Sequence, residues 1–298
     1  MTVDIESLRV DYDRDGYVMV PDLLAPDLLE RLRTETQAIA TGERGVILGA
    51  REVGAGIPSS EVLAHVLTIH FPHKASQLMA QMLSLPEIVG VLTALVGPDV
   101  KAMRSMMFVK NAGKAGQAWY QDDYYIPTRD KSLIGVWIAL DDATIENGCL
   151  WMHPGSHREG VIWLAAPHND PRFDNGMQSH SWSYNPEGGV PVEVKAGGVA
   201  FFKGYTLHRS LNITAKSGFR RALVNHYMSA RSMLPWSSGI PPVPREDFRD
   251  NVMVAGDDPY AGKGLEEITF PFLRPADPEM AQAVFGQALE FSRGRAAA

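Results

Sequence analysis

Two stretches of the sequence contain side chains that could bind one metal ion together. Tyr120 and Asp122 lie in the run 119–127, and residues two apart in a strand point to the same face. Both side chains could therefore aim at one point. His208 follows a turn at the end of a distant apolar run, and a jelly roll can bring such a histidine beside a carboxylate from an earlier strand. Asp122 is preferred over its neighbour Asp123 because it has the two-residue spacing from position 120.

A pair of arginines, Arg220 and Arg221, stands where a later strand is expected to begin. A guanidinium fork can bind a carboxylate through two parallel hydrogen bonds. Side chains alternate along a strand, so one of the two arginines should face the interior while the other faces outward. The sequence alone leaves open which of them is buried.

The elements that must position these residues change in character near residue 100. The first forty residues predict a helix over 3–12, a strand over 17–20 and a helix over 28–40. Residues 41–60 predict a loop, and helices are expected at 74–85 and 86–95. Short strand-like runs separated by turn residues then follow at 105–110, 118–122, 133–140, 149–153, 190–194, 199–202 and 221–228. This order predicts a β-sandwich or barrel with helices packed on the outside of one sheet.

A long irregular segment over 163–189 is typical of a lid or binding loop. Its Trp163, Trp182 and Tyr184 could cap a substrate or pack the loop, and His168 and His180 could contact substrate or solvent. After residue 235 the tail predicts a loop until a final helix at 278–293.

Composition narrows the class of protein. The 298 residues suit one large domain, and 45% hydrophobic with 21% charged residues is ordinary for a globular protein. A net charge of -7 gives no electrostatic basis for binding nucleic acid or an anionic membrane. No apolar stretch of the roughly 20 residues that a membrane span needs is expected. The acidic start is unlike a secretory signal, and the single cysteine, Cys149, fits a reducing cytoplasm.

Four blocks of the sequence resemble the phytanoyl-CoA dioxygenase family of iron(II)- and 2-oxoglutarate-dependent oxygenases. They are DGYVMVP at 15–21, WYQDDYYIP at 119–127, ENGCL and PGSH at 146–157, and HRS, Asn and FRR between 208 and 221. The second block is similar to a metal-binding segment usually written W-H-Q-D, followed by an aromatic residue and a proline. The resemblance runs from about residue 15 to about residue 227, and the four blocks together are specific.

This resemblance implies a mainly β double-stranded β-helix, a cupin-like jelly roll, with flanking helices. It implies a single domain over 1–298, with a helical part at about 1–98, a β-core at about 100–230 and a C-terminal extension at about 231–298. Iron in the family is held by two histidines and one carboxylate, with the opposite face open for 2-oxoglutarate and O₂. Asp122 and His208 match two of these ligands, and Tyr120 stands in place of the first histidine.

The cosubstrate residues carry over in the same way. Arg220 matches the arginine that holds the far carboxylate of 2-oxoglutarate, with Ser210 and Trp137 nearby and Arg221 as the alternative. Four other residues are considered outside this ligand set. Lys110 is expected in solvent, His157 in a turn and His226 in the core or on a sheet surface, while His153 is considered as a replacement for the lost ligand.

Tyr120 is the position at which the sequence departs from the ligand pattern of the family. A phenol with an ordinary pKa of about 10 must lose its proton to bind a metal well, and the resulting phenolate favours iron(III) over iron(II). Three hypotheses follow. Tyr120 binds iron in an unusual oxygenase; Asp122 and His208 hold the metal with 2-oxoglutarate and water; or the chain has lost oxygenase chemistry and binds a ligand or another metal.

The leading prediction is an oxidoreductase that uses iron(II), 2-oxoglutarate and O₂ to hydroxylate or otherwise oxidise a small organic substrate. The alternatives are a non-catalytic ligand- or metal-binding homologue and a non-redox, metal-dependent lyase or isomerase. Formation of succinate from 2-oxoglutarate distinguishes them. The sequence does not reveal the substrate, and a homodimer is left open.

Overall fold

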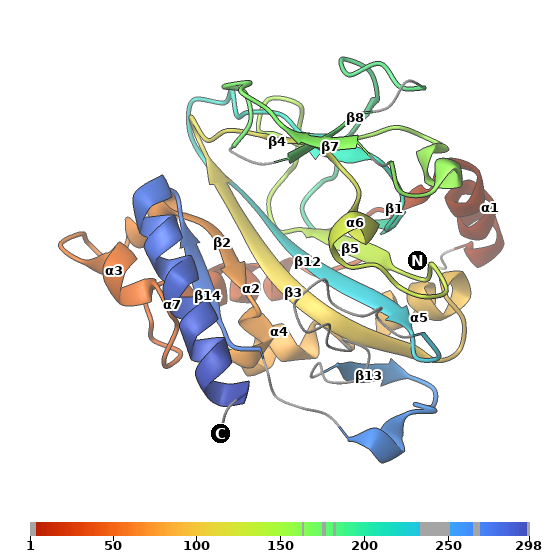
Figure 1. The fold of residues 1–298 in the computed structure, drawn as a ribbon, viewed down its shortest axis with the longest axis horizontal. Coiled ribbons are helices and arrows are strands. Elements are labelled where there is room, and N and C mark those ends of the chain that lie inside the picture. Colours follow the sequence, from red (N-terminus) through yellow and green to blue (C-terminus); the bar gives the residue numbers. More distant parts are fainter. Residues whose placement is uncertain are drawn as a thin grey trace.

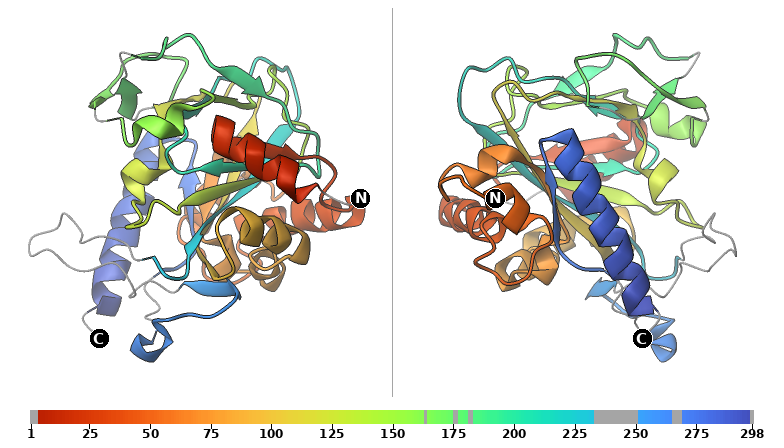
Figure 2. Two further views of the ribbon diagram at one scale, coloured as in Figure 1. Left: turned by 90° about the vertical axis from the view of Figure 1, so that its right-hand side faces the viewer. Right: turned by 60° about the vertical axis from the view of Figure 1, so that its left-hand side comes forward.

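The computed structural model describes residues 4–162, 164–174, 177–180, 183–232, 251–264 and 269–296. Helices at the start of the chain are followed by two antiparallel sheets that face each other, and a long C-terminal helix lies along one edge (Figures 1 and 2). A mainly β fold with flanking helices is thereby confirmed. Two facing antiparallel sheets are the arrangement of the cupin-like double-stranded β-helix.

The N-terminal segment has the predicted order of helix, strand and helix. Helix α1 (Ile5–Asp15) begins where the Asp4 side chain accepts from the backbone N–H of Ser7, and it ends at Gly16, whose φ is 86°. Strand β1 (Tyr17–Val20) follows, and α2 (Pro26–Ala40) starts with a proline in its first turn. The remaining α-helices are α3 (Ala50–Gly54), α4 (Gln77–Gln81), α5 (Pro86–Leu95), α6 (Asp122–Tyr125) and α7 (Pro278–Ala296).

The larger sheet has the strand order β1-β10-β5-β12-β3-β2-β14, with β13 also paired to β3. Its further strands are β10 (Val199–Lys203), β5 (Ile134–Ala139), β12 (Phe219–Ser229), β3 (Val100–Asn111), β2 (Val66–His70), β14 (Phe272–Pro275) and β13 (Val252–Ala255). The long strands β3 and β12 cross the centre of Figure 1. Their register pairs Arg220 with Lys110 and His226 with Arg104.

The smaller sheet has the order β4-β11-β6-β9 and faces the centre of the larger one. Its strands are β4 (Gln117–Tyr120), β11 (His208–Ser210), β6 (Leu150–Met152) and β9 (Val190–Val192). In the pairing of β11 with β4, His208 lies opposite Tyr120. A separate hairpin joins β7 (Leu164–Pro167) to β8 (Met177–His180), and short 3₁₀ helices lie at Val62–His65, Pro72–Lys74, Ser156–Glu159 and Ala261–Lys263.

Strand β5 shows how the two faces of the larger sheet differ. Val136 and Ile138 belong to the large apolar cluster that includes the buried residues of α2 and α5. Trp137 and Ala139 point the other way and pack with buried residues of the smaller sheet, among them Met152. The alternation of side chains along a strand therefore separates an outer face under the helices from an inner face that can line a cavity.

Both ends of the chain contribute to the larger sheet. Strands β1 and β2 come from the range predicted as helical, about 1–98, and β13 and β14 come from the C-terminal extension. The three predicted ranges therefore do not mark separate layers, and the single-domain assignment stays a prediction. Three loop predictions are also incomplete, because α3 lies within 41–60, the β7–β8 hairpin lies within 163–189, and β13 and β14 lie in the tail between residue 235 and the final helix. The final helix is confirmed.

One segment of the described residues, Gln77–Leu95, is long and apolar enough by length and composition to cross a membrane. The prediction that no such stretch exists is therefore wrong on this criterion. In the structure the segment is divided into α4 and α5, and Met79, Ile88 and Leu92 are fully buried in the main core. A core helix passes the same test, so the segment is weak support for a membrane span.

Candidate metal and cosubstrate site

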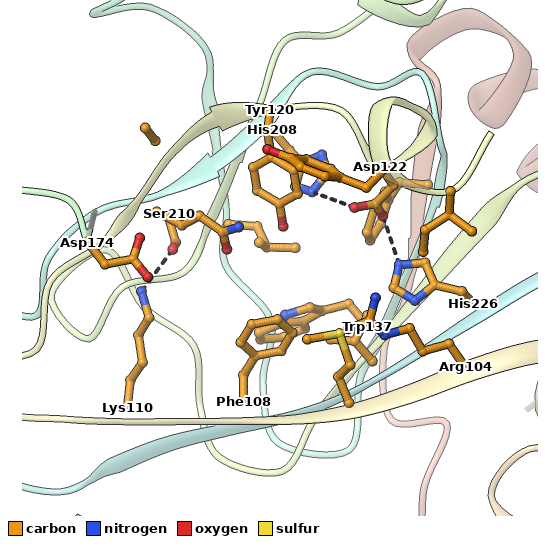
Figure 3. A pocket seen from close by; sticks show the side chains of 18 of the residues that line it. Arg104, Phe108, Lys110, Tyr120, Asp122, Trp137, Asp174, His208, Ser210 and His226 are labelled. Carbon is orange, nitrogen blue, oxygen red and sulfur yellow. Dashed lines mark hydrogen bonds and ion pairs between the residues drawn. The ribbon is translucent and has the colours of Figure 1, made fainter. Parts of the chain in front are cut away.

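A cavity of about 290 Å³ lies between the inner face of the larger sheet and the smaller sheet. Its lining includes Tyr120, Asp122, Trp137, His208, Ser210 and Arg220, which are all the residues that the sequence assigned to the metal and cosubstrate. Figure 3 shows two groups of polar side chains around this cavity. Tyr120, His208 and Asp122 form one group, and Lys110, Ser210 and Asp174 form the other (Figure 3).

Asp122 reaches the cavity by a different route from the one predicted. Strand β4 ends at Tyr120, and Asp122 begins the short helix α6, so the prediction of a strand through 122 is wrong. Gln121 is extended and its side chain donates to the carbonyl of Gly160, which fixes the turn between strand and helix. Tyr120 and Asp122 nevertheless line the same cavity.

The carboxylate of Asp122 lies between two histidines. Its Oδ1 is 3.7 Å from Nε2 of His208, and its Oδ2 is 3.0 Å from Nε2 of His226. Burial raises the pKa of Asp122, but the neighbouring His226 and His208, the hydrogen bond from His226 and the charge of Arg104 outweigh it, so the pKa lies below its ordinary value. Asp122 is therefore an ionised oxygen donor.

His208 presents a free ring nitrogen to the cavity. Its Nδ1 lies 2.8 Å from the carbonyl oxygen of Thr206, which can only accept, so Nδ1 carries the proton. Its Nε2 is buried and has no hydrogen-bond partner. Burial lowers the pKa of the His208 imidazole despite the nearby Asp122 charge. A neutral imidazole with an unpaired Nε2 lone pair beside a carboxylate fits a metal ligand.

Tyr120 packs against His208, its partner across the strand pair. The two ring centroids are 4.1 Å apart, and the ring of Tyr125 lies 6.2 Å from that of Tyr120. Burial and the negative charge of Asp122 hold the pKa of the Tyr120 phenol well above its ordinary value. Without a bound cation the phenol therefore stays protonated. Within the described ranges, no group of three His, Cys, Asp or Glu residues is arranged to bind a metal.

His226 belongs to the site, although the sequence analysis placed it in the core or on a sheet surface. It is buried on β12, lines the cavity and forms the 3.0 Å contact with Oδ2 of Asp122. Positions 220, 222, 224 and 226 share one face of β12, so a buried Arg220 implies that His226 also faces inward. Strand alternation was thus the signal that could have found it.

The structure distinguishes between the two arginines. Arg220 is 3% exposed, lines the cavity and lies 5.7 Å from the ring centroid of Trp137, while its Nε has no hydrogen-bond partner. Burial lowers the pKa of Arg220 to about 10. Arg221 points away and forms two 2.8 Å hydrogen bonds with Asp141. Arg220 is therefore the guanidinium available to a ligand in the cavity.

Lys110 is a second buried cation, and its predicted exposure to solvent is wrong. It lies opposite Arg220 in the β3–β12 register, is 8% exposed, and its Nζ donates to Oγ of Ser210 at 3.0 Å. Burial and the neighbouring Arg220 charge lower the pKa of Lys110 well below its ordinary value. Lys110, Ser210 and Arg220 form a cluster of donors, which we call the cationic cluster.

The other aromatic and histidine candidates lie in different places. His153 packs between Trp119 and Tyr184, with ring centroids 4.5 and 4.9 Å away, and does not line the cavity. It therefore does not replace the lost ligand. His168 does line the cavity, whereas His180 is exposed on β8. Trp163 and Trp182 lie outside the described residues.

The family comparison agrees with this geometry. The sequence profile of the family described as phytanoyl-CoA dioxygenase (PhyH) matches residues 12–222, more than half of the chain. The chain belongs to the phytanoyl-CoA dioxygenase family. This is a family of dioxygenases that depend on iron(II) and 2-oxoglutarate, as the sequence resemblance implied.

Individual relatives match this chain either over a shorter stretch or at lower sequence identity. A phytanoyl-CoA dioxygenase of Arabidopsis thaliana is 38% identical over 119 residues, which cover 39% of this chain and 40% of that protein. The peroxisomal phytanoyl-CoA dioxygenase of Rattus norvegicus is 27% identical over 236 residues. These residues cover 74% of this chain and 68% of that protein. Among solved structures, that of the non-heme monooxygenase ThoJ without ligand matches this chain with a TM-score of 0.66 at 20% sequence identity. The match covers 97% of this chain and 96% of the ThoJ chain, and it supports the fold.

Proposed function

We propose that the chain is an iron(II)- and 2-oxoglutarate-dependent oxygenase that oxidises a small organic substrate with O₂. The observation that carries this proposal is the pairing of two groups in one cavity. An ionised Asp122 and a neutral His208 with a free Nε2 lie at one side, and the cationic cluster lies at the other. The first group suits a divalent cation, and the second suits a dicarboxylate.

The donor set fits iron with one change from the family pattern. Asp122 and His208 would supply a carboxylate oxygen and an imidazole nitrogen, and the hydrogen bond from His226 would fix the orientation of Asp122. Tyr120 would be the third donor only after losing its proton, because burial keeps the phenol neutral in the metal-free protein. Iron(II) with 2-oxoglutarate supplies the oxidising chemistry, consuming O₂ and releasing succinate and CO₂.

The protein residues bind, orient and exclude water. Arg220 would hold the far carboxylate of 2-oxoglutarate through its fork, and Ser210 and Lys110 would donate to the same group. Trp137 closes the floor beneath Arg220, which keeps the guanidinium out of water. The low exposure of these donors strengthens each charge–charge contact with a bound dianion.

One observation favours the second candidate function, a non-catalytic ligand-binding homologue. The Tyr120 ring packs against His208 at a tilt of 54° and stays protonated, so the metal side of the cavity can be complete as a packed, metal-free structure. The non-redox lyase or isomerase remains an alternative that no contact in the site favours. Cytoplasmic location, the absence of nucleic-acid and membrane partners, and a homodimer all stay predictions.

Succinate formation tests the proposal. Iron(II)-loaded protein is exposed to air with 2-oxoglutarate, and succinate is quantified with and without the variant Arg220→Gln. The proposal expects protein-dependent succinate, even as a slow uncoupled reaction, and expects Arg220→Gln to remove it. Wild-type protein that binds 2-oxoglutarate and forms no succinate would support the ligand-binding candidate instead.

A further inference from the structure

A second cavity, of about 710 Å³, adjoins the first along strand β3. Seven residues line both cavities, among them Arg104, Met106, Phe108 and Lys110, which alternate along the inner face of β3. The two cavities therefore meet over this strand. The metal donors Asp122 and His208 line only the first cavity, and so do Ser210 and Arg220 of the cationic cluster, whereas Lys110 of that cluster borders both cavities.

The outer wall of the second cavity comes from the C-terminal segment. Strand β14 extends the larger sheet beside β2, and helix α7 lies along β14 (Figures 1 and 2). The apolar residues of this wall and its floor are Leu67, Phe272, Leu273, Ala276, Ala281 and Phe285. A space of this size with mostly apolar walls suits the body of a small organic molecule.

Arg104 stands where the two cavities meet. It lies opposite His226 in the β3–β12 register, its Nη2 is 2.9 Å from Nδ1 of His70, and its guanidinium lies 5.6 Å from the ring centroid of Phe71. Its Nε is buried and has no hydrogen-bond partner. Among the described residues, no carboxylate lies within ion-pair distance of Arg104, and the Asp122 charge acts on it from farther away.

The other cations around the second cavity already have partners. Arg274 pairs with Asp174 at 3.1 Å, Lys114 donates to the carbonyls of Val66 and Val109, and Lys110 donates to Ser210. Arg104 differs because its buried Nε has no hydrogen-bond partner, although the charge of Asp122 acts on the guanidinium from the first cavity. A largely buried cation costs free energy unless an anion compensates it, and a ligand can supply that anion.

We propose that the second cavity binds the substrate of the proposed oxygenase, and that this substrate is a carboxylate with a largely apolar body. Arg104 binds the carboxylate at the junction, and the apolar body lies between β2, β14 and α7. A single guanidinium with an unpartnered buried donor matches one carboxylate better than a more highly charged group. This inference rests on the proposed function for the identity of the ligand as a substrate, and on the geometry alone for its chemical class.

Binding of matched acids and amides tests the role of Arg104. Octanoate and the isosteric, neutral octanamide are titrated calorimetrically into the full-length protein, without additions and again with iron(II) and 2-oxoglutarate under anaerobic conditions. Octanoate is expected to bind at least about tenfold more tightly, equivalent to about 1.4 kcal/mol. Arg104→Gln should remove this preference, Arg104→Lys should keep part of it, and the control Arg274→Gln should retain it. Equal affinity in the wild type, or a preference that survives Arg104→Gln, would overturn the proposal.

A second variant tests the location of the apolar body and does not depend on Arg104 variants folding. Ala281 faces the cavity from α7, whereas Ala283 on the same helix is exposed and does not line it. Ala281→Trp should weaken decanoate much more than butyrate, and Ala283→Trp should change neither. Unchanged decanoate binding in Ala281→Trp would show that the apolar body lies elsewhere.

The two proposals fail in different ways. Protein that forms no succinate but shows Arg104-dependent binding of octanoate would contradict the oxygenase and keep the assignment of the second cavity. Protein that forms succinate but binds octanoate and octanamide equally would keep the oxygenase and contradict the substrate class.

Discussion

The two sides of the first cavity differ in how closely they follow the family pattern. The metal side brings Asp122 and His208 to one cavity, and the phenol of Tyr120 lies at the position where the sequence resemblance predicts a second histidine. The cationic cluster has a buried arginine, a buried lysine and the Ser210 hydroxyl directed at one space. The side proposed to bind a dicarboxylate therefore has the residues that the resemblance predicts, whereas the proposed metal side departs from that resemblance at Tyr120.

The cationic cluster is informative because burying its charged side chains costs folding free energy. Lys110 and Arg220 lie opposite each other on neighbouring strands, and both are nearly inaccessible to water. Two buried cations on facing positions destabilise a fold, and the charge of Asp174 near Lys110 offsets only part of that cost. A protein that no longer bound an anion would gain nothing from keeping this pair. The cationic cluster therefore supports retained binding of 2-oxoglutarate.

The largest effect is expected on the metal side. Asp122→Ala should weaken iron(II) binding by about 100-fold or more, since even the outer partners of metal ligands account for about 10- to 100-fold. The measurement is competition with a metal chelator under anaerobic conditions.

The neighbouring carboxylate provides a matched control. Asp123 does not line the cavity, and burial raises its pKa to about 7, so Asp123→Asn removes only about half a negative charge at neutral pH. This variant should keep iron affinity close to that of the wild type. A result in which Asp123→Asn loses iron and Asp122→Ala keeps it would reverse the ligand assignment.

The next effect concerns the cationic cluster and the choice between two adjacent arginines. Arg220→Gln should weaken 2-oxoglutarate binding by about 2–4 kcal/mol, or roughly 30- to 1,000-fold in Kd, because a buried charge pair is broken. Arg221→Gln should leave this Kd unchanged and lower the free energy of unfolding by about 1 kcal/mol, since Arg221 pairs with Asp141 near the surface. Calorimetry with iron(II) present measures the first quantity, and denaturant unfolding measures the second. Equal losses of 2-oxoglutarate affinity in both variants would contradict the assignment.

Tyr120 variants should show a smaller gain on the metal side. Tyr120→His restores a neutral imidazole and should tighten iron(II) binding by about tenfold, because no proton has to leave the donor. If the phenol binds iron(III), the oxidised wild-type protein should have a visible charge-transfer band. That band should be absent in Tyr120→Phe and present in Tyr125→Phe, its neighbouring control. A colourless iron-loaded wild type in air would place Tyr120 outside the coordination sphere.

The smallest expected effect is a pH dependence in the cationic cluster. Burial lowers the pKa of Lys110 below the ordinary 10.5, so the free protein loses this positive charge at a lower pH than an exposed lysine does. A dianion binds the protonated form better, so 2-oxoglutarate affinity should be highest at lower pH and decline as pH rises through the Lys110 pKa. The decline should be up to about tenfold. Lys110→Arg keeps its charge and should flatten the profile across the neutral to alkaline range; an equal slope in both proteins would assign it to another group.

The sequence predicted the site where a local pattern carried the information. The two-residue spacing of Tyr120 and Asp122 and the family blocks were enough to bring both residues and His208 to one cavity. The local route was wrong, because a helical turn at Asp122 replaces the expected strand. Such a turn is stabilised by contacts from Gln121 to distant backbone groups, which no local pattern reports.

Residues whose roles depend on strand pairing could not be predicted. Lys110 resembles an ordinary strand residue until the β3–β12 register places it opposite Arg220. For His226, alternation along β12 indicates only that it faces inward with Arg220, and its place beside Asp122 depends on the fold. Strand β14 was missed for the same reason, since it is short and gains its stability from pairing with β2 far away in the sequence. The apolar wall that it shares with α7 became visible only in the folded chain.

Anaerobic titration of iron(II) and 2-oxoglutarate into metal-free protein tests the central claim most directly. The chelate of the two in the site has a weak visible absorption band, which should appear with saturation, bleach when O₂ is admitted and leave succinate behind. This result would establish an oxygenase that tolerates Tyr120. No band at any concentration of iron(II) would contradict the account, because the metal and the cosubstrate would then not meet in this cavity.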